Sequence, residues 1–111
     1  MMGTAQAKVP TRATQGEVIQ IKTKLYHPME TGWRKDANGN EVPRKRAHVF
    51  VCRFKGREVF RANFHTGVSA DPYLSFYTKA IESGVYEFTW TEDDGTEFSA
   101  SAPITVVSVA Q

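Results

Sequence analysis

Apolar and polar side chains alternate with a period of two along much of the chain, a pattern typical of half-buried β-strands. Residues 18–25 show it most clearly, because polar side chains occupy one face almost throughout. The face expected to be buried holds Ile19, Ile21, Thr23 and Leu25. In residues 48–54 both faces are apolar, so we expect this strand to lie in the middle of a sheet. The remaining predicted strands cover residues 58–64, 73–78, 84–91, 96–102 and 104–109.

Turn residues separate most of these strands. Lys55-Gly56-Arg57 and Asp94-Gly95 predict tight hairpins, since glycine readily adopts the positive φ angles of such turns. About seven strands and no convincing helix predict an all-β fold, an immunoglobulin-like antiparallel β-sandwich. Two long connections interrupt the pattern, at residues 27–47 and 65–72, and loops of this length are usually functional or mobile.

The first sixteen residues lack this alternation. Their content of Ala, Thr, Gln and Gly predicts a flexible N-terminal tail over residues 1–16, followed by a single sandwich domain over residues 17–111. A length of 111 residues fits one domain with one core. No apolar stretch in residues 1–16 resembles a secretory signal, and none in the chain reaches the roughly 20 residues of a membrane helix.

Composition narrows the class of protein further. Hydrophobic residues make up 41% and charged residues 23% of the chain, as in ordinary soluble proteins, which argues against wholesale disorder. The 14 basic and 12 acidic residues leave a formal net charge of +2, too small by itself to imply a polyanionic partner. A single cysteine excludes an internal disulfide and multi-cysteine metal sites.

Cys52 and the three histidines, His27, His48 and His65, invite comparison with a copper site in a small β-sandwich. The usual arrangement places Cys, His and Met close together near the C-terminus, whereas Met29 precedes Cys52 here. The cysteine lies in a predicted strand among apolar neighbours, which favours a buried, inert thiol. An intermolecular disulfide is the alternative, since an odd cysteine often pairs outward in an oxidising compartment.

No pattern of residues predicts catalysis. The serines lack the nucleophile-elbow sequence, and the adjacent Asp93 and Asp94 are typical of a solvated turn. Residues 36–41 fit an Asn-Gly hairpin turn better than a calcium loop. We therefore expect no catalytic, cofactor-binding or metal-binding residues, no cofactor, and a binding module in place of an enzyme. A small metal-binding or redox β-sandwich protein is the alternative.

Basic residues and one tryptophan gather in the first long connection. They are Trp33, Arg34, Lys35, Arg44, Lys45 and Arg46. Acidic residues dilute this charge and no RNA-binding signature is present, so no nucleic-acid partner is expected. A solvated loop is the simplest interpretation. The other is a docking surface for an acidic partner, which would act by steering association more than by raw affinity.

Three stretches closely resemble the SoxZ family. Residues 27–36 read HPMETGWRKD, followed by a glycine and then Val-Pro; residues 67–76 resemble the family's VSxNPYLSF segment, with Asp71 where Asn is usual. Residues 84–95 resemble its glycine-opened strand and Asp-Gly hairpin. The resemblance runs from about residue 18 to residue 109. It implies the small, non-catalytic subunit of the SoxYZ sulfur carrier complex of bacterial thiosulfate oxidation.

The resemblance also implies a partner and a compartment. The partner, SoxY, has a flexible C-terminal arm with a Gly-Gly-Cys-Gly-Gly type motif, and its cysteine carries sulfur intermediates between the enzymes of the pathway. Residues 107–111 contain neither glycine nor cysteine, so we expect this chain to anchor the arm's base and not to be the arm. The resemblance therefore implies a heterodimer with SoxY and transient docking with other Sox enzymes. It implies no membrane partner. SoxZ-like subunits are exported with the partner, so we expect a periplasmic location.

Overall fold

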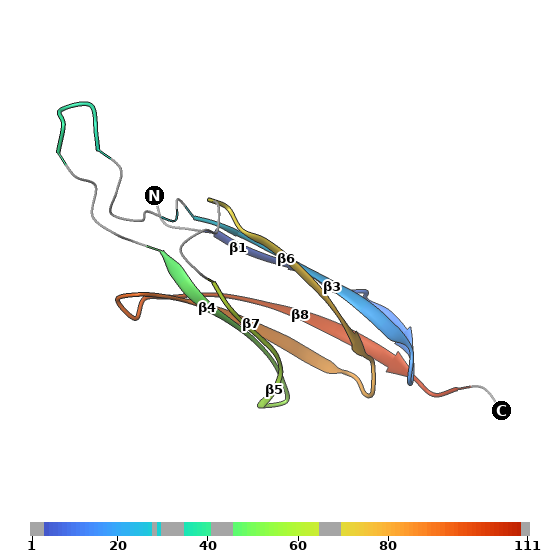
Figure 1. Ribbon diagram of the computed structural model, residues 1–111. Helices are drawn as coiled ribbons and strands as arrows, with labels where there is room; N and C mark the ends of the chain where they lie inside the picture. The colour runs from blue at the N-terminus through green and yellow to red at the C-terminus, as the bar shows by residue number, and fades with distance from the viewer. Residues whose placement is uncertain (1–3, 28, 30–34, 41–45, 65–69, 110–111) are drawn as a thin grey trace.

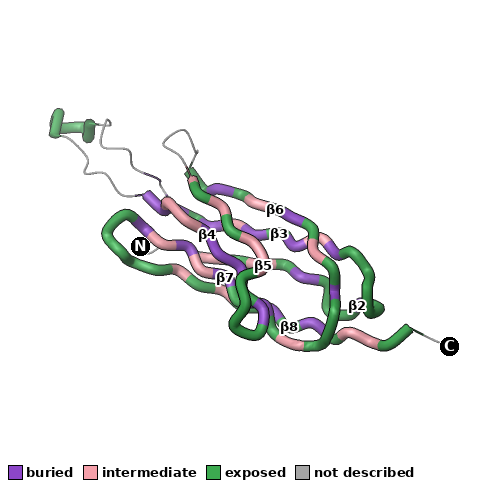
Figure 2. The backbone as a smooth tube through the Cα atoms, turned by 60° about the horizontal axis from the view of Figure 1, so that its bottom comes forward, coloured by how far each residue is buried: buried purple, intermediate pink, exposed green. Residues whose placement is uncertain are grey.

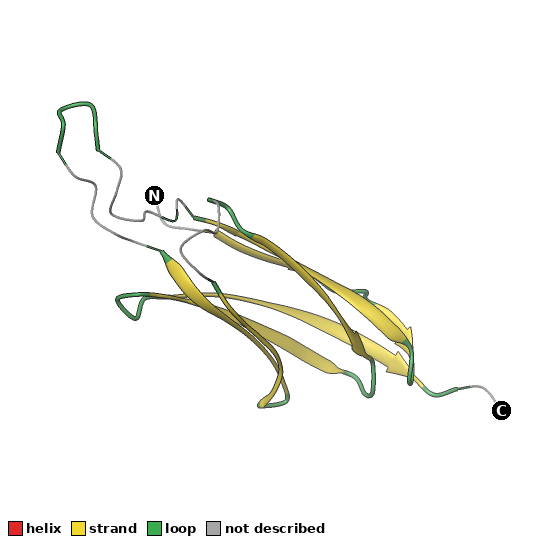
Figure 3. Ribbon diagram, viewed as in Figure 1, coloured by secondary structure: helices red, strands yellow, loops and turns green. Residues whose placement is uncertain are grey.

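The computed structural model describes residues 4–27, 29, 35–40, 46–64 and 70–109. These residues form eight strands in two facing sheets, and the described ranges contain no helix (Figures 1 and 3). The strands are β1 (Thr4–Lys8), β2 (Arg12–Thr14), β3 (Val18–Tyr26), β4 (Ala47–Phe54), β5 (Arg57–Asn63), β6 (Tyr73–Lys79), β7 (Gly84–Glu92) and β8 (Glu97–Val107). The predicted all-β sandwich is confirmed.

The smaller sheet has the strand order β1-β3-β6 and the larger sheet the order β2-β8-β7-β4-β5. Neighbouring strands are antiparallel except for β2, which runs parallel to β8. Because β4 pairs with both β5 and β7, the prediction of a central strand at residues 48–54 is confirmed.

The hydrophobic core lies between the two sheets. Its β3 contribution is the predicted face, with Ile19, Ile21, Thr23 and Leu25 all buried. Phe50 of β4 is fully buried, and its ring centroid lies 5.0 Å from that of Trp90 on β7. Phe60 of β5 stacks on Phe76 of β6 with ring centroids 4.3 Å apart, so aromatic packing joins the two sheets along these edge strands.

The prediction of a flexible tail over residues 1–16 is wrong for the described residues 4–16. β1 pairs with β3 in the smaller sheet, and β2 pairs with β8 in the larger one. Val9 and Ala13 are buried in the core, and Ala5 and Ala7 pack against it. Alanine is a weak hydrophobic signal, which is why the alternation was missed. The segment therefore crosses from one sheet to the other and is part of the sandwich.

Residues 96–102 and 104–109, predicted as two strands, instead contribute to one continuous strand, β8. Pro103 has no N–H to donate. The Thr105 N–H donates to the carbonyl of Thr11, the residue just before β2, at 2.9 Å, so it points toward the edge of β8 that pairs with β2. Backbone N–H groups two residues apart in a strand point the same way. The nitrogen of Pro103 thus faces a stretch where β2 has not yet begun to pair. A strand tolerates proline where the missing N–H faces an unpaired side.

Gly84 begins β7 at a close approach between strands. A Cβ atom added there would lie 2.6 Å from Cζ of Phe54, whose ring packs against Tyr86 with centroids 4.6 Å apart. Glycine at this position therefore reflects close packing, since any side chain would displace the Phe54 ring from the core.

Candidate functional site

The described ends of the two long connections and the β7–β8 hairpin lie at one end of the sandwich (Figure 1). Antiparallel pairing of β3 with β6, and of β4 with β7, places the polar residues that flank these strands at that end. They are His27, Arg46, Asp71, Glu92 and Asp93. We refer to these five residues as the loop anchor.

His27 and Glu92 form a buried pair in the loop anchor, with 2% and 1% of their surface exposed. The Nδ1 atom of His27 accepts the Met29 N–H at 2.8 Å, so Nε2 carries the ring hydrogen and donates it to Oε2 of Glu92. Within the described part of the chain, Oε1 of Glu92 has no hydrogen-bond partner. The pair ties the first residue of the long loop to the end of β7.

Two hydrogen bonds connect the backbone of His27 to Asp71 in the second long connection. The His27 N–H donates to Oδ1 of Asp71 at 2.8 Å, and the Asp71 N–H donates to the His27 carbonyl at 2.8 Å. Asp71 has a positive φ of 51°, a conformation that Asp and Asn tolerate better than most residues. Asp71 therefore joins the start of the first long connection to the end of the second.

Arg46, predicted as part of an exposed docking surface, is buried with 3% of its surface exposed, so that prediction is wrong for this residue. Its Nη2 donates to the Phe64 carbonyl at 2.8 Å, and its own carbonyl accepts the Asp93 N–H at 3.0 Å. Nη1 lies 3.9 Å from Oδ2 of Asp93. Arg46 is the last residue of the long loop. Its bonds to Phe64 and Asp93 therefore hold this end of the loop against two neighbouring segments.

The rest of the basic loop is only partly described. Lys35 is exposed, whereas Trp33, Arg34, Arg44 and Lys45 lie outside the described residues. The predicted Asn-Gly turn is confirmed. Oδ1 of Asp36 accepts the N–H groups of Asn38 and Asn40 at 2.9 and 3.0 Å, and Gly39 has a φ of 83°.

Cys52 lies fully buried on β4, with Phe60 of β5 and Phe88 of β7 as its cross-strand partners. Burial raises the pKa of its thiol from 9.0 to about 12. Burial of Tyr86 likewise raises the pKa of its hydroxyl, and the nearby Cys52 thiol adds a smaller electrostatic contribution in the same direction. A disulfide to another chain would require the thiol to leave the core, so this position supports the inert thiol and not the intermolecular disulfide.

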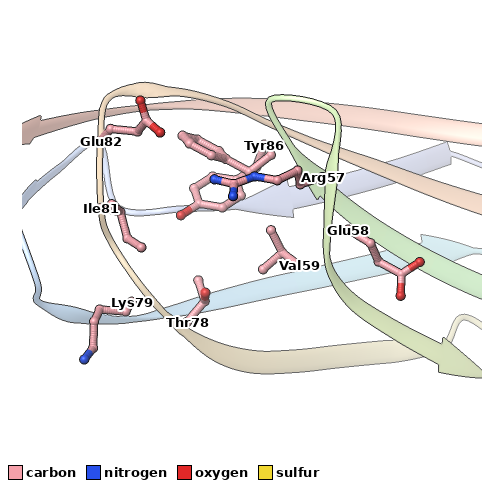
Figure 4. A pocket seen from close by; sticks show the side chains of 9 residues that line it. Arg57, Glu58, Val59, Thr78, Lys79, Ile81, Glu82 and Tyr86 are labelled. Atoms are coloured by element: carbon pink, nitrogen blue, oxygen red, sulfur yellow. The ribbon is translucent and has the colours of Figure 1, made fainter.

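The side of the sandwich between β5 and β6 holds a groove of about 200 Å³ (Figure 4). Residues Phe54, Arg57, Glu58, Val59, Thr78, Lys79, Ile81, Glu82 and Tyr86 line it. A hydrogen bond from Nζ of Lys55 to Oε1 of Glu82, 2.8 Å long, holds the pKa of that exposed carboxyl below its usual range. None of these described lining residues is a cysteine, histidine or serine.

Of the three histidines considered for copper, the two that the structure describes, His27 and His48, are not gathered with Cys52 as metal ligands. His48 lies beside Oδ1 of Asp93 at 3.3 Å, His27 belongs to the loop anchor, and His65 lies outside the described residues. Across the described ranges, no three His, Cys, Asp or Glu side chains gather as metal ligands do. Nor does any described segment form a helix with the length and apolarity of a membrane crossing.

Sequence reasoning missed the partnership of His27 with Glu92, which are 65 positions apart. A usable signal was present. Tyr86, Phe88 and Trp90 mark the inward face of β7, and the same alternation places Glu92 on that face. A carboxylate at a core position needs a partner, although the sequence does not say which residue supplies it.

Two facing sheets, with buried residues on strands of both (Figure 2), define a small immunoglobulin-like β-sandwich. Solved structures with this fold support the class. The superoxide reductase (neelaredoxin) of Ignicoccus hospitalis is 20% identical, with a TM-score of 0.71 over 93% of this chain and 80% of that one. The sulfur carrier protein SoxY of Chlorobium limicola f. thiosulfatophilum is 12% identical, with a TM-score of 0.65 over 94% and 79%. At these identities the likeness concerns the fold alone.

The family model for sulphur oxidation protein SoxZ matches residues 7–103, so this chain belongs to the SoxZ family and is a component of the Sox sulfur-oxidation system. This match confirms the resemblance based on the three sequence motifs. A separate comparison with curated protein sequences found no match. The match begins within β1 and ends in β8, so it spans both sheets of the sandwich.

Proposed function

We propose that this chain is the non-catalytic subunit of a SoxYZ-type sulfur carrier complex. It binds a SoxY-like subunit and anchors it, while the C-terminal cysteine of that partner carries sulfur intermediates between the enzymes of thiosulfate oxidation. The observation that carries the proposal is the SoxZ family match over residues 7–103. A periplasmic location, reached together with the partner, is part of the same proposal.

The chemistry of the chain's one cysteine supports a division of labour between two subunits. A sulfur carrier needs a thiolate that other enzymes can reach, because the thiolate is the nucleophile in sulfur transfer. Cys52 is the single cysteine in the sequence, it is fully buried, and its pKa is raised to about 12. This supports the proposal that a SoxY-like arm supplies the carrying thiol.

The loop anchor supports a role for the long loop in recognition. It fixes residues 27 and 46, the two ends of the loop, to the β7–β8 hairpin and to the segment before β6. A loop held at both ends loses less conformational freedom when a partner binds. We propose that Trp33, Arg34, Lys35, Arg44 and Lys45, without Arg46, contribute to docking.

Co-purification tests the subunit pairing. The chain is produced with and without a SoxY-like subunit, and the mass of each sample is measured by size-exclusion chromatography with light scattering at micromolar concentration. We expect a stable heteromer, and we expect it also when the partner's arm cysteine is replaced by serine, because the anchor does not use that thiol. A chain that stays monomeric beside the partner contradicts the proposal.

Turnover measurements test the non-catalytic role. With the complete set of thiosulfate-oxidising enzymes, replacement of the partner's arm cysteine should abolish turnover, whereas Cys52→Ala in this chain should preserve it. Consumption of thiosulfate by this chain alone would show that it is an enzyme.

A further inference from the structure

The outer face of the β1-β3-β6 sheet, the smaller layer in Figure 1, is positively charged. Its charged side chains are Lys8, Lys22, Lys24 and Lys79. The three strands contain no aspartate or glutamate. Within the described part of the chain, no ion pair joins these lysines to a carboxylate. We refer to this surface as the lysine face.

Strand register concentrates the charge and adds exposed aromatic rings. Lys22 lies directly opposite Lys8 of β1, and Lys24 lies opposite Tyr73 of β6. Tyr73 and Tyr77 point outward, with 58% and 68% of their surface exposed. Tyrosine is enriched at protein interfaces, where its rigid ring supplies contact area.

The stability of the isolated fold does not account for this arrangement. Like charges directly opposite each other in a sheet are destabilising, and Lys8 and Lys22 are such a pair. The larger sheet shows the ordinary alternative, because Arg53 lies opposite Glu87 and the Arg61 guanidinium bonds Glu58 at 2.9 Å. The two outer faces of the sandwich therefore differ in charge although the net charge is only +2.

We propose that the lysine face docks the acidic surface of an enzyme that acts on the sulfur carried by the complex. The inference rests on the proposed function and names the surface that such an enzyme meets. Unpaired lysines attract an acidic partner over several ångströms and speed the encounter, while Tyr73 and Tyr77 supply the contact. Permanent interfaces are more hydrophobic than transient ones, so this charged face fits a transient partner better than SoxY itself.

A pair of charge-reversal variants tests the proposal. Lys22→Glu/Lys24→Glu alters the lysine face, and Arg53→Glu/Arg61→Glu makes the same change of charge on the opposite sheet. All four side chains are on strands, and Lys22, Arg53 and Arg61 are exposed. Each variant is first mixed with the SoxY-like subunit, and the resulting complex is purified. The probes are the purified thiosulfate-oxidising enzymes of the same organism, immobilised singly.

Association rates are then measured by surface plasmon resonance at low and high salt. At low salt we expect the lysine variant to associate about tenfold more slowly than the unaltered complex with at least one enzyme. The arginine variant should keep its rate, and the difference should shrink as salt screens the charges.

Three results would overturn the proposal, and they are distinguishable. Equal rates for both variants would show that the lysine face is not used. Loss of the SoxY-like subunit from the lysine variant alone would assign the face to the permanent interface. Failure of the unaltered chain to bind the SoxY-like subunit would instead contradict the proposed function, before any enzyme is tested.

Discussion

Cys52 shows how position on a strand decides the chemistry of a side chain. It occupies the inward-facing series of β4, between Phe50 and Phe54, so its thiol is cut off from water. A thiol without water or a nearby cation has little tendency to ionise, which is why its pKa rises to about 12. A residue type that is reactive in many proteins is here a small hydrophobic side chain.

We expect Cys52 to resist thiol reagents in the native protein. At neutral or mildly alkaline pH the thiolate is almost absent, and the core excludes the reagent. Incubation with a chromogenic disulfide reagent should therefore give no signal until guanidinium chloride is added, after which one thiol per chain should react. Rapid labelling of the folded protein would contradict the burial of this side chain.

Glu92 accepts the side-chain hydrogen bond that holds His27 in the loop anchor. Replacement by alanine removes the acceptor of the His27 Nε2–H and leaves that buried donor unpaired, which should cost about 1–3 kcal/mol of unfolding free energy. Glu92→Gln keeps an acceptor oxygen and should cost less. Urea denaturation measures both, and Glu97→Ala, at an exposed position of β8, is the control that should change little. If Glu92→Ala is as stable as the control, the hydrogen bond between His27 and Glu92 does not contribute to stability as described.

At the scale of secondary structure, the N-terminal segment contributes a strand to each of the two sheets. β1 and β2 lie in different sheets, and the residues between them include the buried Val9. This crossing closes one side of the sandwich. The opposite side, between β5 and β6, is bridged by side chains such as the stacked Phe60 and Phe76.

Val9→Ala tests whether the N-terminal segment is part of the core. Loss of two buried methyl groups should lower the unfolding free energy by about 1–2 kcal/mol. Gln6→Ala, on the exposed face of β1, is the matched control and should change it by less than about 0.5 kcal/mol. Deletion of residues 1–10 should lower the urea midpoint further than Val9→Ala. If all three proteins unfold at the same urea concentration, the segment is a tail as the composition suggested.

Strands with strong alternation were predictable, and weakly patterned ones were not. The ranges of β3, β4, β5, β6 and β7 agree with the sequence within one or two residues. β1 and β2 were missed because short alanine and threonine side chains give little contrast between faces. The break placed at Pro103 was wrong because a proline's effect depends on which side of the strand its nitrogen faces, and only the pairing with β2 decides that.

For the whole molecule, burial of two weak acids in one core has a consequence for stability in alkali. The pKa of Cys52 is raised to about 12 in the folded protein, and the pKa of Tyr86 is raised in the same direction. The unfolded chain loses these protons first, at pKa values near 9.0 and 10.0. Above that range the unfolded state binds fewer protons than the folded state, so the unfolding free energy decreases as pH rises.

We therefore expect urea midpoints to be independent of these two groups below about pH 8 and to fall between pH 9.0 and about 12. Cys52→Ala should make the alkaline decrease less steep, because one of the two acids is gone, and Tyr86→Phe should act in the same way. A series of urea titrations across this range makes the measurement. Identical slopes for the native protein and both variants would contradict the assignment of the effect to these groups.

The sequence by itself determined the all-β class, most strand boundaries, the buried face of β3 and the family, because these depend on local alternation and on contiguous motifs. The tertiary structure decided which distant residues meet. It brings His27 to Glu92 and buries Arg46, whose guanidinium bonds the Phe64 carbonyl. On the outer face of the smaller sheet it places Lys22 opposite Lys8 and Lys24 opposite Tyr73. Such partnerships follow from sheet order and register, and alternation along a single strand contains no information on which strand lies beside it.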